Sequence, residues 1–106
     1  MQLAKLNEMV GGWFVGDFSP SVLRNSDFEA CVKHYKMGDF EPAHYQKTAS
    51  EITVVISGQA RIGDQKLSAG DIILLEPFEV ADFEALTDVV LVAVKTPSSP
   101  EDKVLA

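Results

Sequence analysis

The chain has 106 residues, which is enough for one domain with a single hydrophobic core. Acidic residues outnumber basic ones by 16 to 9, and the net charge of −7 argues against nucleic-acid binding and against docking on anionic membranes. The single cysteine, Cys31, cannot form an intrachain disulfide, and no stretch approaches the roughly 20 apolar residues of a membrane span. The N-terminus lacks the long apolar run of a signal peptide, so we expect a cytoplasmic protein whose residues 1–106 form one domain.

Short strands separated by turn residues are predicted for the first half of the chain. Leu3, Leu6 and Val10 stand at helical spacing and predict a short helix or turn that ends at Gly11-Gly12. Residues 13–18 and 22–24 are expected to form an extended arm and a short strand. Residues 28–36 alternate between two faces. One face carries Phe28, Ala30, Val32 and His34, and the other carries Glu29, Cys31, Lys33 and Tyr35.

The second half of the chain continues the pattern with almost no helical signal. Strands are predicted at 51–57, 60–62, 65–67, 72–75, 82–85 and 89–96, and Gly63-Asp64 predicts a tight hairpin between the second and third of these. Residues 97–106 contain two prolines and several charges, so we expect an irregular tail. The succession of short strands favours an antiparallel sandwich or barrel.

Two predicted strands are apolar on both faces. If Glu51 points inward, Thr53 and Val55 do so as well, which leaves Ile52, Val54 and Ile56 on the outer face. An antiparallel sheet in a monomer normally leaves one face polar. We therefore expect the outer face to be covered both by the N-terminal arm around Trp13 and by a second subunit in a homodimer.

The stretch from Gly38 to Gly58 collects polar side chains on neighbouring strands. His44 and Gln46 share one face of their strand, and Glu51 on the next strand can reach the same place. With the two glycines, these three residues resemble the first cupin motif, in which a second histidine normally occupies the position of Gln46. Residues 70–77 resemble the first half of the second cupin motif, with one extra residue before Pro77. Beyond it the resemblance weakens, because Asp82 stands where histidine is usual.

This resemblance to the cupins implies an all-β fold, an antiparallel double-stranded β-helix or jelly-roll β-barrel. It covers residues 28–96 directly. Residues 1–20 are expected to form an N-terminal arm and residues 97–106 a C-terminal tail, as in a set of small single-domain cupins without an assigned activity.

The resemblance also implies a site inside the barrel. Cupins typically bind one divalent metal with three histidines and a glutamate, and the matching positions here are His44, Gln46, Glu51 and Asp82. This oxygen-rich set would hold Mn, Fe, Zn or Mg. The alternative is a metal-free polar network in which Gln46 donates a hydrogen bond to one of the two carboxylates. Because two of three imidazoles are replaced, we favour the second interpretation.

Two further residues are candidates for contact with a bound molecule. His34 would lie near His44 if its face of the strand is the interior, and Glu84 follows Asp82 on the same face. Three functions stay open. The protein binds a small molecule such as a sugar or sugar-derived acid, it is a metal-dependent isomerase, epimerase or dioxygenase, or it is a dimeric scaffold with a vestigial cavity.

Overall fold

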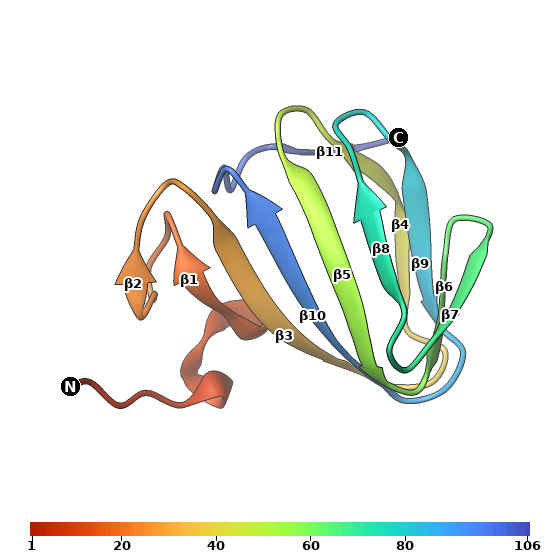
Figure 1. Ribbon diagram of the computed structural model, residues 1–106, viewed down its shortest axis with the longest axis horizontal. Helices are drawn as coiled ribbons and strands as arrows, with labels where there is room; N and C mark the ends of the chain where they lie inside the picture. Colours follow the sequence, from red (N-terminus) through yellow and green to blue (C-terminus); the bar gives the residue numbers. More distant parts are fainter.

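Two β-sheets form nearly the whole molecule in the computed structural model, which describes residues 1–106 (Figure 1). Two 3₁₀ turns, η1 (Leu6–Glu8) and η2 (Val10–Gly12), precede the first strand. The first sheet contains, in spatial order, β2 (Leu23–Arg24), β1 (Trp13–Gly16), β3 (Glu29–Tyr35), β10 (Val89–Thr96), β5 (Ser50–Ser57) and β8 (Ile72–Leu75). The second contains β11 (Lys103–Leu105), β4 (Phe40–Gln46), β9 (Ala81–Ala85), β6 (Gln59–Ile62) and β7 (Gln65–Ser68).

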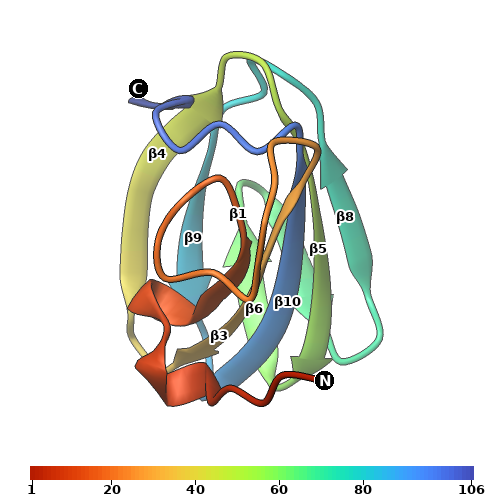
Figure 2. The ribbon, with the colours of Figure 1, turned by 90° about the vertical axis from the view of Figure 1, so that its left-hand side faces the viewer.

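The chain crosses repeatedly from one sheet to the other. From β3 onward each strand lies in the sheet opposite its predecessor, except for the β6–β7 hairpin, whose two strands stay together. All pairings are antiparallel apart from the short contact of β1 with β2. Figure 2 shows the sheets as two facing walls, with β4 and β9 opposite β10 and β5. The predicted jelly-roll barrel is confirmed.

The core lies where the inward faces of the two sheets meet. Along β9 the side chains alternate between buried and half-buried, and Ala81, Phe83 and Ala85 point inward. Val89 and Leu91 of β10 and Val55 of β5 oppose them within one buried cluster. Burying a side chain of this kind stabilises the fold by about 1.5–3 kcal/mol, so this cluster holds the two walls together.

One glycine turn is obligatory for the crossing from β5 to β6. Gly58 has a φ of +85°, and a Cβ there would lie 2.0 Å from the carbonyl oxygen of Asp88. Only glycine fits both the backbone conformation and the close approach. The predicted hairpin at Gly63-Asp64 is confirmed between β6 and β7.

Two expectations about the ends of the chain need correction. The tail is not irregular throughout, because β11 pairs antiparallel with β4 and extends the second sheet. The N-terminal arm does not cover the outer face of the first sheet, because β1 pairs with β3 and lengthens that sheet instead. Neither 3₁₀ turn has the length and apolar character needed to span a membrane.

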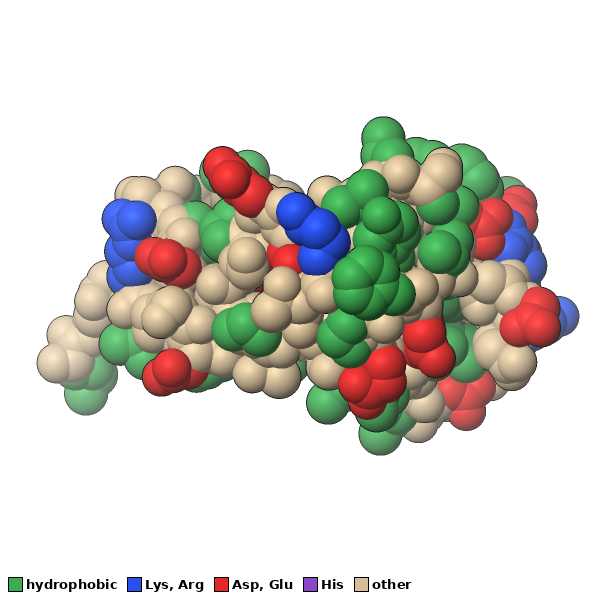
Figure 3. Space-filling view, turned by 90° about the horizontal axis from the view of Figure 1, so that it is seen from above, with side chains coloured by type: hydrophobic (Ala, Val, Ile, Leu, Met, Phe, Trp, Pro, Cys, Tyr) green, Lys and Arg blue, Asp and Glu red, His purple; other side chains and the backbone are tan.

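The outer face of the first sheet therefore stays uncovered. Ile52 pairs with Leu74, and Val54 pairs with Ile72, so apolar side chains form a continuous patch across β5 and β8. Ile72 is 66% exposed and Leu74 is 50% exposed. Further hydrophobic side chains gather at the upper end of the molecule (Figure 3), where the loop between β8 and β9 exposes Phe78.

Candidate functional site

A cavity of about 330 Å³ lies between the two sheets. Its deep walls are apolar, with Leu91 and Ala93 from the first sheet and Ile62, Ala81 and Phe83 from the second. These residues face one another because each occupies an inward position of its strand. The floor of the cavity is thus the upper surface of the hydrophobic core.

Segments from both ends of the chain complete the cavity wall. Trp13 of β1 and Phe18 after it line the cavity, and their rings meet edge to face with centroids 6.4 Å apart. Pro100 and Lys103 of the C-terminal segment line it as well. Figure 2 shows this segment passing over the top from β10 to β4, with the N-terminal segment in front of the space between the sheets.

Two lysine side chains converge on the ring of Trp13. The Nζ atom of Lys33 lies 5.6 Å from the ring centroid, and that of Lys95 lies 5.0 Å from it. Both distances are within the range of a cation–π interaction. Lys33 and Lys95 project from the inward faces of β3 and β10 and line the cavity.

Charged residues form a row across the first sheet near the cavity. Lys95 of β10 is in register with Glu29 of β3 on one side and with Glu51 of β5 on the other. Glu29 is buried, and desolvation raises the pKa of its carboxyl, although the positive charge of Lys95 opposes the shift. The row therefore places one cation between two carboxyl groups, one of which resists ionisation.

A tyrosine and a glutamate form a second polar element. The hydroxyl of Tyr35 donates a hydrogen bond to Oε2 of Glu41 over 3.2 Å, and its ring packs on Phe83 with centroids 4.4 Å apart. Burial, reinforced by the nearby charge of Glu41, raises the pKa of Tyr35. Tyr35 is thus held as a neutral hydrogen-bond donor at neutral pH.

The structure brings two of the four predicted metal ligands to the cavity. His44 lines it from β4, and Glu51 lines it from β5. Nδ1 of His44 lies 3.0 Å from the carbonyl oxygen of Pro42, which can only accept, so Nδ1 carries a hydrogen and Nε2 is left free. Gln46 is buried beside the tail, outside the cavity lining, and neither atom of its amide has a hydrogen-bond partner.

Asp82 and Glu84 do not point into the barrel as expected. Asp82 borders the cavity, but its carboxylate forms a two-point contact with Arg61 at 2.8 and 3.1 Å, and Glu84 lies 3.5 Å from the same guanidinium. The hydrogen bonds from Arg61 hold the pKa of Asp82 below its usual range. On β9, Ala81 and not Asp82 is in register with His44. A shift of one residue along a strand moves every side chain to the opposite face of the sheet.

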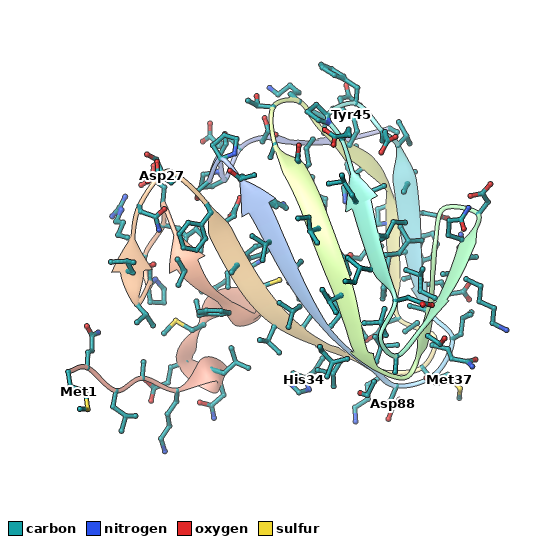
Figure 4. The ribbon with its side chains drawn as sticks, in the orientation of Figure 1. Met1, Asp27, His34, Met37, Tyr45 and Asp88 are labelled. Atoms are coloured by element: carbon teal, nitrogen blue, oxygen red, sulfur yellow. The ribbon has the colours of Figure 1, made fainter.

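The expected position of His34 is also corrected. Glu29, Cys31, Lys33 and Tyr35 line the cavity, so the alternate face with His34 is the outer one. Figure 4 shows His34 at the lower end of β3, whereas Tyr45, the neighbour of His44, lies at the upper end of the molecule. The two histidines therefore do not share a site.

Comparison with known proteins identifies the fold. No family model and no curated protein matches the sequence. An uncharacterised double-stranded β-helix protein from Klebsiella pneumoniae superposes with a TM-score of 0.74 at 24% identity, over 99% of this chain and 91% of the other. A cupin from Shewanella frigidimarina superposes with a TM-score of 0.64 at 21% identity, over 74% of this chain and 72% of the other. The oxalate decarboxylase of Bacillus subtilis gives 0.67 at 18% identity, over 76% of this chain and 24% of that enzyme.

The chain has the cupin fold.

The metal site of the cupins does not follow from this fold. The Bacillus subtilis oxalate decarboxylase contains Mn(II) centres. In the present protein no group of three or more histidine, cysteine, aspartate or glutamate side chains is placed to hold a metal ion. Asp82 is bound to Arg61, and Gln46 is not among the residues that line the cavity, so His44 and Glu51 lack the further ligands that such a site needs. The residues present do not fit a resident divalent ion.

The sequence motifs did not identify the residues that dominate the cavity of this protein. Trp13, Lys33, Tyr35 and Lys95 all lie outside the two motifs. The alternation of residues 28–36 left open which face of this strand is the interior. The structure places the face with Glu29, Cys31, Lys33 and Tyr35 in the cavity.

Proposed function

We propose that the protein binds a small organic molecule, of the size of a sugar or sugar-derived acid, in the barrel cavity. The observation that carries this proposal is the cavity itself, whose volume of about 330 Å³ lies near the lower end of the ~300–1,000 Å³ usual for small-molecule sites.

The chemistry of the wall supports a ligand that is part apolar and part polar. Leu91, Ala93 and Phe83 offer apolar contact at the floor. Tyr35 with Glu41, and the free Nε2 of His44, offer hydrogen-bond partners above it. Such a combination of an apolar surface with a few fixed polar groups orients a ligand that carries hydroxyl groups.

A metal-dependent enzyme is the less favoured alternative because the ligand set is incomplete. If the cavity binds its ligand without a metal, the melting temperature of purified protein is unchanged by a chelator such as EDTA. A bound structural or catalytic ion would stabilise the native state by mass action, and its removal would lower the melting temperature.

The proposal is tested by thermal shift with a panel of hexoses, hexitols, uronates and aldonates. A molecule that binds the native state at 100 times its Kd stabilises it by about 2.7 kcal/mol. Ala93→Leu narrows the cavity and is expected to abolish the shift, whereas Val92→Leu on the outer face keeps it. A shift of equal size in the Ala93→Leu protein would place the ligand elsewhere, and no shift with any member of the panel would contradict the proposal.

We also infer that the protein forms a homodimer through the outer face of the first sheet. The support is the continuous apolar patch of Ile52, Val54, Ile72 and Leu74 on β5 and β8, which a second copy can cover by the same surface.

A further inference from the structure

We infer that the ligand carries a carboxylate and that Lys33 and Lys95, held beside Trp13, bind it. This inference rests on the proposed function, because it names the chemical class of the molecule in the same cavity.

The lysines of the cavity have no ion-pair partners. The three ion pairs within 4.0 Å in the molecule all involve arginine, namely Arg24 with Asp17 and Arg61 with Asp82 and Glu84. Lys33 and Lys95 are each half-buried, and Lys103 lies at the rim. Lys95 is in register with Glu29 and Glu51, but neither carboxylate lies within 4.0 Å of its ammonium group. An anion that binds between the two lysines would therefore supply the close ionic contact that the fold does not.

Trp13 fixes where the two ammonium groups lie. Both Nζ atoms are within cation–π distance of one indole ring, at 5.6 and 5.0 Å, although they come from different strands. Gly11 allows this arrangement, since a Cβ at that position would lie 3.0 Å from Nζ of Lys33. Two like charges near one ring repel each other, and a carboxylate between them removes that repulsion.

The charge of the cavity fits a ligand with a single negative charge. Three of the nine basic residues of the protein line it, together with Glu29, Glu41 and Glu51, while Asp82 is neutralised by Arg61. Glu29 resists ionisation because it is buried. The three lysines and three glutamates are equal in number, so the two ammonium groups beside Trp13 form a local positive site in a cavity without a large net charge, which a singly charged carboxylate fits better than a doubly charged phosphate.

The opposite wall indicates that the ligand also carries hydroxyl groups. Glu41 accepts one hydrogen bond from Tyr35 and has three further lone-pair sites, and His44 presents Nε2. These groups accept hydrogen bonds from hydroxyls. The structure therefore assigns the cavity to a hydroxylated carboxylic acid, with its carboxylate toward Trp13 and its hydroxyls toward β4.

The test compares matched acid and neutral probes by isothermal titration calorimetry. D-Galacturonate is measured against its methyl ester and D-galactose, and D-gluconate against D-glucitol, with inorganic phosphate as a further probe. At least one acid is expected to bind about tenfold or more tightly than its neutral partner, which corresponds to about 1.4 kcal/mol. Because this comparison uses the unaltered protein, it does not depend on any variant folding.

Substitutions then locate the carboxylate. Lys33→Met and Lys95→Met keep the approximate length of the side chain and remove its charge. Each substitution is expected to lower the affinity for the acid about tenfold and to leave the affinity for a neutral probe unchanged. Lys66→Met, on the exposed strand β7, is the matched control and leaves the affinity unchanged.

The outcomes separate this inference from the proposed function. Equal binding of acid and neutral probes, tighter binding of phosphate than of any acid, or full affinity in the double variant Lys33→Met/Lys95→Met would overturn the carboxylate assignment while leaving a ligand in the cavity. Failure of every probe to bind would overturn both.

Discussion

Glu29 is the one charged residue of the cavity wall that is fully buried, with only 4% of its surface exposed. The charged groups that act on its carboxyl are one cation, Lys95, and the acidic side chains of Glu51 and Asp102. Desolvation is the largest effect and raises the pKa of Glu29, so folding makes its ionised form less favourable than in the unfolded chain. Glu29 therefore lowers the stability of the folded protein at neutral pH. Because it lies in the cavity wall, we expect it to contribute to the function of the site and not to the stability of the fold.

Glu29→Gln is expected to stabilise the protein at neutral pH. Because the pKa of Glu29 is raised in the folded state, its contribution to the free energy of unfolding is fully present below the unfolded pKa of about 4.3. This contribution is lost as the pH rises through the folded pKa. The variant lacks this loss, so its advantage in the free energy of unfolding should grow between pH 4 and pH 7. Urea denaturation at several pH values measures it, with the exposed Glu8→Gln as control. A difference that is constant with pH would contradict the assignment.

At the scale of elements, the C-terminal segment owes its position to one aspartate. The backbone N–H groups of Thr48 and Ala49 each donate a hydrogen bond to Oδ2 of Asp102 at 2.8 Å, and Asp102 is 3% exposed. Burial disfavours the charged form, but these hydrogen bonds outweigh it and hold the pKa of Asp102 below its usual range. Asp102 thereby fixes β11 on β4 and places Lys103 at the rim of the cavity.

Asp102→Ala should release this segment. Two buried N–H groups lose their acceptor, which costs about 1–3 kcal/mol, and the amides of β11 should exchange faster with deuterium than those of β4. The neighbouring exposed Glu101→Ala is the control. Because the pKa is lowered on folding, the contribution of Asp102 is present above about pH 4 and is lost as pH falls through the folded pKa. Unchanged protection of β11 in the Asp102→Ala protein would refute the anchoring role.

For the whole molecule, the proposed homodimer is expected to form through the uncovered apolar patch. Ile72→Lys places a charge at the centre of the patch and should convert a dimer into a monomer at micromolar concentration, as measured by sedimentation velocity. Val80→Lys replaces a comparably exposed apolar residue away from the patch and should leave the dimer intact. A monomeric wild-type protein would exclude this interface.

Alternation and turn chemistry were sufficient to predict the strands. The hairpin at Gly63-Asp64 and the strand pattern around Val89–Thr96 follow from local rules, and the structure confirms them. The tail was harder to predict, because β11 is stabilised by Asp102 and by pairing with β4, which are contacts across more than 50 residues of sequence. Local propensity carries no information about such contacts.

The site was predicted only in part, for a reason particular to strands. His44, Glu51 and Asp82 line the cavity, although Arg61 holds the carboxylate of Asp82, whereas Glu84 and His34 do not line it. Because the side-chain period of a strand is two residues, Ala81 rather than Asp82 takes the inward position in register with His44. In β3 each face mixes apolar and polar residues, so the sequence does not determine which face lines the cavity.

The density inside the barrel, in a crystal structure of the protein purified from cells without a chelating column, is the most direct test of what the cavity binds. We expect an organic molecule next to Trp13, with a carboxylate between Nζ of Lys33 and Nζ of Lys95 and hydroxyls toward Glu41 and His44. A divalent ion coordinated by His44 and Glu51, with no organic molecule beside Trp13, would contradict this expectation.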